Sequence, residues 1–241
     1  MNDFRMIIQK EIKSKPGTGE FVEELNNWVY FNKGFAKNND FYLLSKFGPT
    51  AKQILAKGGD CSDKSRLLST MLKSVGINST LVMIYGCKTC GATHTIVEAH
   101  YDNGRMSADP VFNIVFPKRE GEYYGIQELR DNPNLLIRRL DFLKAERGSE
   151  DKVSFYKRDT ETYSWIKTIN WSKNNITQTV GYFIGQFTDA PFLVMRPHFL
   201  EDPKLFYSYF LFVMGAMFLM LSIVISWFVR KYNKNSNHTS R

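Results

Sequence analysis

The sequence predicts an α+β domain followed by one membrane-spanning helix. Apolar residues recur at helical spacing in 20–33 and 61–75. Strand-like segments then follow at 79–86, 93–101 and 105–110. Because the helices come first and the strands come together afterwards, the order favours α+β over an alternating α/β fold. A long uncharged segment at 205–229 adds the membrane-spanning helix.

The first helix is predicted over 20–33. Phe21, Leu25, Trp28 and Val29 lie near one stripe of such a helix. The next segment, "FGPTAKQILAKGGD", is typical of a turn, a short helix and a glycine break.

The second main helix is predicted to begin at Cys61. Asp60 is a suitable N-cap, and Asp63 occupies the third helical position, where it completes a capping box. The apolar positions that follow repeat with the helical period, and Gly76 suits a left-handed C-cap. We therefore expect a buried helix with the cysteine at its start.

The remaining soluble part contains a helix-like stretch at 126–146 and an aromatic-rich region at 150–200. The domain boundaries that follow from these patterns are a lead segment at 1–19, a core at 20–150, an extension at 151–204, a transmembrane helix at 205–229 and a short basic tail at 230–241.

The uncharged segment at 205–229 is long enough to cross a bilayer. At ~1.5 Å per residue it extends about 37 Å, more than the ~30 Å of a hydrocarbon core. Tyr207, Tyr209 and Trp227 fit an aromatic belt at its ends. The sequence therefore predicts a single-pass membrane protein.

The orientation of this anchor is predicted differently by two rules. Four Lys and Arg residues follow the span and two lie just before it, which places the tail inside. The N-terminus, however, has scattered charges and no apolar run typical of a signal peptide. Because moving a short tail across a membrane is easier than exporting the whole domain, we expect a cytosolic domain anchored by its tail.

Charge and cysteine content argue against a nucleic-acid-binding protein and against a disulfide-stabilised one. The net charge is +8, but no Lys/Arg cluster with interleaved aromatic residues stands out, so no nucleic-acid partner is expected. Three cysteines do not form a disulfide framework.

Cys61 has the position of a reactive thiol. At a helix N-terminus, unpaired N–H groups and the positive end of the macrodipole favour the thiolate. Nucleophilic catalysis also needs a base and a group that orients the base. His94 on the second strand and Asp109 on the third are the candidates, and burial by packing is the alternative interpretation of Cys61.

The triad interpretation requires a particular strand register. An ideal two-residue loop at Asn103-Gly104 would place Asp109 opposite Glu98, about 13 Å along the strand from His94. A wider loop that moves the register by two or four residues would bring Asp109 diagonal to His94 or opposite it. We therefore predict such a shift.

Three blocks of sequence resemble the transglutaminase-like core of the papain-like cysteine enzymes. They are the block around "GGDCSDKSRLL", the block "HTIVE" and the Asp-Pro pair that closes the hairpin. The resemblance covers about residues 20–115. It implies Cys61 as nucleophile, His94 as general acid and base, and Asp109 as the residue that orients the imidazole.

The resemblance also implies an activity: attack on an amide carbonyl of a peptide or protein through a thioester intermediate. No cofactor or metal is implied, and calcium-loop signatures are missing. Hydrolysis is favoured over crosslinking because water is the default acceptor. An inactive transglutaminase-like module that binds a partner at the membrane is the alternative.

Cys87 and Cys90 precede His94 in the motif "CKTCGATH". They fit a redox pair, half of a zinc site completed by His94 or His100, or ordinary loop cysteines. Glu98 has two possible roles from the sequence: a hydrogen-bond partner of the site, or a solvated residue of the strand.

Overall fold

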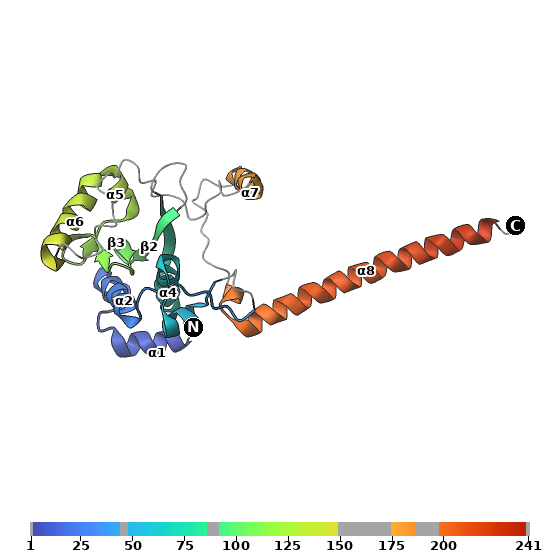
Figure 1. The fold of residues 1–241 in the computed structure, drawn as a ribbon, viewed down its shortest axis with the longest axis horizontal. Helices are drawn as coiled ribbons and strands as arrows, with labels where there is room; N and C mark the ends of the chain where they lie inside the picture. The colour runs from blue at the N-terminus through green and yellow to red at the C-terminus, as the bar shows by residue number, and fades with distance from the viewer. Residues whose placement is uncertain (1, 44–47, 86–91, 149–174, 187–197, 240–241) are drawn as a thin grey trace. The chain divides into compact units, whose positions relative to one another are not determined.

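The computed structural model describes residues 2–43, 48–85, 92–148, 175–186 and 198–239 (Figure 1). The chain divides into two compact units, Met1–Met195 and Arg196–Arg241. The first unit holds the helices and the sheet of the predicted α+β domain, and the second holds one long helix. The predicted fold class is confirmed.

Among its described residues, the first unit begins with four helices and continues with six strands and three further helices. The helices before the sheet are α1 (Asn2–Glu11), α2 (Gly19–Asn32), α3 (Ala51–Lys57) and α4 (Cys61–Ser74). The strands are β1 (Asn78–Tyr85), β2 (Ala92–Tyr101), β3 (Gly104–Asp109), β4 (Ile114–Val115), β5 (Pro117–Arg119) and β6 (Glu122–Tyr123). The later helices are α5 (Ile126–Asp131), α6 (Pro133–Arg147) and α7 (Asn175–Gly185).

The central sheet has four antiparallel strands in the order β1-β2-β3-β4, and β5 pairs with β6 separately. The three strands predicted from the sequence are present, each with its ends within one residue of the expected positions. This sheet carries the β2–β3 hairpin on which the predicted His94 and Asp109 lie.

The sheet is covered on both faces, and alternation along each strand sorts its side chains between them. Val97, Ala99 and Tyr101 of β2 pack with α1, α2 and α4, whereas Ile96 packs with α5 and α6. Figure 1 shows these two groups of helices on either side of the strands. The helix that begins at Cys61 therefore lies directly against the strand that carries His94.

The helix-like stretch predicted at 126–146 is two helices. Asn132 separates α5 from α6, and Pro133 occupies the first turn of α6. A proline is tolerated there because the first N–H groups of a helix have no intrahelical acceptor. Leu136, Leu140 and Leu143 then bury one face of α6 against the sheet.

The second unit contains a short 3₁₀ helix at His198–Leu200 and α8 (Pro203–Thr239). Its segment Pro203–Lys231, 29 residues long, is long and apolar enough to cross a membrane, and its most apolar part is not buried within the structure. This is consistent with the predicted single-pass anchoring. Much of the predicted aromatic-rich extension, 151–174 and 187–197, lies outside the described residues.

Candidate active site

Two glycines shape the backbone that leads into α4. Gly58 has φ of +82°, a conformation that side chains disfavour, and a Cβ on it would lie 2.5 Å from the carbonyl oxygen of Gly34. A Cβ on Gly59 would lie 2.3 Å from the Cβ of Asp63. The "GGD" motif is therefore a tight approach to the helix, and it sets the position of Cys61 in the first turn.

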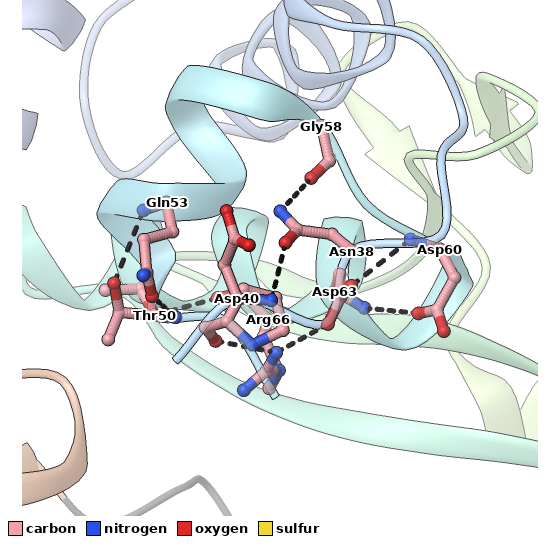
Figure 2. Close-up of polar contacts among 10 residues, drawn as sticks. Asn38, Asp40, Thr50, Gln53, Gly58, Asp60, Asp63 and Arg66 are labelled. Carbon is pink, nitrogen blue, oxygen red and sulfur yellow. Dashed lines mark hydrogen bonds and ion pairs between the residues drawn. The ribbon is translucent and has the colours of Figure 1, made fainter. Parts of the chain in front are cut away.

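Asp60 and Asp63 cap α4 reciprocally, as the sequence predicts. The Asp60 carboxylate accepts a hydrogen bond from the Asp63 N–H at 3.0 Å, and the Asp63 carboxylate accepts one from the Asp60 N–H at 3.3 Å (Figure 2). Arg66 donates to the other Asp63 oxygen and to the carbonyl of Pro49. Burial raises the pKa of Asp63 despite the Arg66 charge. Asp63 is thus held by structural contacts.

The segment after α2 also fixes the start of α4, a role that the sequence patterns did not reveal. Phe35 forms a parallel bridge with Gly59, and the Ala36 N–H donates to the Gly59 carbonyl at 3.1 Å. The Asn38 side chain donates to the Gly58 carbonyl at 2.8 Å (Figure 2). The backbone before Cys61 is therefore held by residues 20 or more positions away, which no local pattern reports.

Cys61 itself is half-buried at the first position of α4. One turn later, the buried Ser65 hydroxyl donates to the Thr95 carbonyl of β2 at 2.8 Å. Thr95 directly follows His94, so this bond fixes the helix that carries the thiol against the strand that carries the imidazole.

The β2–β3 register differs from that of an ideal Asn103-Gly104 turn by two residues. Glu98 pairs with Ser107, and Tyr101 pairs with Gly104. Continued by one step, this register places Asp109 opposite Ile96 and therefore diagonal to His94, within reach of a side chain. The predicted shift is present, but the prediction of a wider loop is wrong: the loop has two residues, Asp102 and Asn103, one position earlier than the Asn-Gly signal suggests.

His94 and Asp109 form a buried pair. His94 Nε2 lies 2.7 Å from Asp109 Oδ2, and the two side chains are 4% and 0% exposed. The other carboxylate oxygen of Asp109 accepts from the N–H groups of Val111 at 2.8 Å and Phe112 at 3.2 Å. Asp109 therefore closes the turn after β3 with one oxygen and holds the imidazole with the other. The Phe112 ring lies against His94, 5.1 Å between centroids.

Cys61 completes the arrangement. Burial alone lowers the pKa of His94, but the charge and hydrogen bond of Asp109, followed by the hydrogen bond and charge of Cys61, raise it to about 9. Because Nε2 faces Asp109, the nitrogen available to the Cys61 side chain is Nδ1. In the structure His94 therefore lies between Asp109 and Cys61 and interacts with both.

The other candidates lie apart from this line or outside the described residues. Glu98 accepts from the Ile126 N–H at 2.9 Å and so anchors α5, and the half-exposed His100 lies 3.9 Å from Glu98. Cys87 and Cys90 fall outside the described residues. Within the described ranges, no group of three His, Cys, Asp or Glu side chains could hold a metal ion.

A model of the transglutaminase-like superfamily matches residues 7–110. Residues 7–110 form a transglutaminase-like domain. The match includes Cys61, His94 and Asp109, and it extends the similarity toward the N-terminus, where α1 adds Ile8 to the core.

Solved structures with partial similarity to this chain include three bacterial proteins. A protein of Cytophaga hutchinsonii provisionally described as a cysteine protease is 17% identical, with a TM-score of 0.36 over 46% of this chain and 37% of the other. A provisionally described protease of Parabacteroides distasonis is also 17% identical, with a TM-score of 0.35 over 45% and 23%. Legionella pneumophila LapG is 14% identical, with a TM-score of 0.33 over 47% and 64%.

The present chain thus spans less than two thirds of each of these proteins. The comparison with curated proteins found no match.

Proposed function

We propose that this chain is a membrane-anchored cysteine enzyme that acts on amide bonds of peptides or proteins through Cys61, His94 and Asp109. One observation carries the proposal: His94 contacts Asp109 on one side and Cys61 on the other. A nucleophile, a base and a group that orients the base are the parts that covalent acyl transfer needs. Hydrolysis is favoured because water is the default acceptor.

Each residue has a distinct task in the proposed reaction. The pKa of His94, about 9, keeps the imidazole protonated at neutral pH and so favours a thiolate on Cys61. The thiolate attacks the amide carbonyl carbon, and His94 gives its proton to the leaving amine as the C–N bond breaks. Neutral His94 then takes a proton from water, whose oxygen attacks the thioester carbonyl carbon. The C–S bond breaks, which releases the carboxylic acid and restores the Cys61 thiolate beside protonated His94. Asp109 holds the ring by its Nε2 throughout.

The oxyanion formed by attack needs hydrogen-bond donors. Cys61 is the first residue of α4, and the first N–H groups of a helix have no acceptor four residues before them within the helix. The Cys61 N–H is therefore suited to donate to the developing oxyanion, with the positive end of the helix dipole behind it.

The anchor belongs to the same proposal. Because α8 is long and apolar enough to span a bilayer, the substrate is expected near a membrane surface. The cytosolic orientation of the domain stays a prediction, and a reporter that is active only in the cytosol, fused to either terminus, measures it.

The test is alkylation of Cys61 by iodoacetamide, followed by mass spectrometry so that each cysteine is read separately. We expect rapid modification at pH 7 in the wild type and a rate roughly 30-fold lower in His94→Ala, because an ordinary thiol is only about 3% ionised at this pH. His100→Ala is the matched control, since this half-exposed histidine lies on the same strand and should leave the rate unchanged. A Cys61 that is inert in the wild type, or equally reactive in His94→Ala, would leave a binding module as the better interpretation.

A further inference from the structure

Lys64 is a buried cation one helical turn after Cys61. It is 3% exposed. Its position in α4 belongs to the stripe that continues with Leu67, Leu68 and Met71, all of which are buried in the core. A lysine on an apolar stripe is unusual, because an ammonium is almost never fully buried without partners.

The partners of Lys64 come from the end of α2. Its ammonium donates to the carbonyl oxygens of Val29 at 3.1 Å and Tyr30 at 2.8 Å, and it lies 5.7 Å from the centroid of the Tyr30 ring. The last carbonyls of a helix carry partial negative charge and have no intrahelical donor. Lys64 therefore fastens the C-terminal end of α2 to the first turn of α4.

This attachment leads to the site along the backbone. The chain that leaves α2 runs to Phe35 and Ala36, which pair with Gly59, and to Asn38, which binds Gly58. By holding Val29 and Tyr30, Lys64 thus fixes the start of the segment whose later residues hold the backbone immediately before Cys61.

The charge of Lys64 also acts on the site. Burial lowers the pKa of Lys64 and the negative charge of Asp109 raises it, with a result of about 8, so the ammonium is protonated at neutral pH. Asp109 on β3 is the charged group that acts on Lys64, and it is paired with His94 on β2. The Tyr30 ring on α2 lies beneath the ammonium, and Cys61 and the mutually paired Asp63 and Arg66 lie on α4 with Lys64.

With a thiolate on Cys61 and a proton on His94, these two charges cancel, and Lys64 cancels Asp109. Starting from the thiol beside protonated His94, loss of the thiol proton therefore takes the buried site from one net positive charge to neutral with Lys64, and from neutral to one net negative charge without it. A net charge in a poorly solvated site is costly, so removing Lys64 disfavours the thiolate.

We propose that Lys64 is a positioning residue of this site, which balances the buried Asp109 charge and holds the end of α2 so that the Cys61 thiolate forms at lower pH. This inference rests on the proposed function. Lys64 acts through Asp109 and through the backbone before Cys61, and it does not contact the substrate.

The test is the pH dependence of Cys61 alkylation in the full chain in detergent micelles, measured from pH 4 to 8 by mass spectrometry. Lys64→Gln keeps a donor for the α2 carbonyls and loses the charge. We expect the pH of half-maximal alkylation rate to rise by about 0.5–1 unit in this variant. Lys64→Arg keeps the charge and should stay close to the wild type. Lys73→Gln, which removes an exposed charge from the last turn of the same helix, is the matched control and should show no shift.

The outcomes separate the two proposals. An unshifted midpoint in Lys64→Gln, with a lower unfolding temperature, would show a purely structural lysine and overturn this inference while the proposed function stands. A wild-type Cys61 that is inert at every pH would overturn the proposed function and this inference with it. If Lys64→Gln does not fold by circular dichroism, Lys64→Met supplies the second neutral variant, because an unbranched apolar side chain suits a buried position.

Discussion

The two regions that meet at the candidate site are held by different kinds of contact. The cap of α4 is formed by neighbours in sequence: Asp60 and Asp63 cap each other three residues apart, and Gly59 leaves room for Asp63. The hairpin residues His94 and Asp109 are fixed by strand register and by a buried pair 15 residues apart. The difference predicts that damage to the hairpin pair affects both stability and chemistry, whereas damage to the helix start acts mainly through position.

The largest effect is expected at Asp109. Asp109→Ala removes the acceptor of the Val111 and Phe112 N–H groups and the partner of the His94 ring. These groups cannot turn to water instead, because the Asp109 side chain is 0% exposed. We expect a loss of about 3–5 kcal/mol in the free energy of unfolding, the range for breaking a buried charge pair. Thermal unfolding in detergent, followed by circular dichroism, measures it. Asp102→Asn, in the exposed turn of the same hairpin, should change stability by less than about 0.5 kcal/mol.

Asp109→Asn sharpens the comparison, because it keeps an acceptor for Val111 and Phe112 and removes the charge. The pKa of His94 is raised from 6.5 to about 9, with burial opposing and Asp109 providing the main favourable contributions. The stability that comes from this raised pKa is fully present below pH 6.5 and is lost as the pH rises through about 9. The stability difference between wild type and Asp109→Asn should therefore shrink across that window, and a difference that is constant with pH would contradict the assignment.

A smaller effect is expected at the helix start. Gly59→Ala places a Cβ 2.3 Å from the Cβ of Asp63, so the cap must move. We expect the free energy of unfolding to fall by about 1–3 kcal/mol, which is typical of overpacking, and the alkylation of Cys61 to become slower. Gly34→Ala is the matched control, since a Cβ there meets nothing within 4 Å and no positive φ is involved. Equal unfolding temperatures for the two variants would show that the helix start tolerates displacement.

The smallest effect is expected where the two regions are joined. Ser65→Ala removes the buried hydrogen bond to the Thr95 carbonyl, with an expected loss of about 1–2 kcal/mol. Thr70→Ala removes a bond from the same helix to its own Arg66 carbonyl, and it should be nearly neutral because alanine is the better helix former. Chemical unfolding of both variants under the same conditions gives the difference. A larger loss of unfolding free energy in Thr70→Ala than in Ser65→Ala would contradict the greater importance of the hydrogen bond between helix and strand.

The helix start was predictable in detail and the hairpin was not. The Asp60–Asp63 capping box, the beginning of α4 at Cys61 and the left-handed Gly76 are each set by residues within a few positions of one another. The hairpin turn lies one residue from its predicted place, because pairing across β1, β2 and β3 and burial on both faces outweigh the local preference of Asn103-Gly104. The Lys64 contacts with Val29 and Tyr30 join positions about 35 residues apart, beyond any local pattern.

The sequence by itself determined the α+β class, the helix that begins at Cys61 and the long apolar segment of α8, because these depend on periodicity, caps and length. It also supplied the three blocks that resemble the transglutaminase-like superfamily, whose model matches residues 7–110. Only the tertiary structure decided that Asp109 stands diagonal to His94, that Asn38 reaches Gly58 and that Lys64 is buried. These depend on the packing of distant segments, where the summed burial of many side chains selects one register and one set of partners.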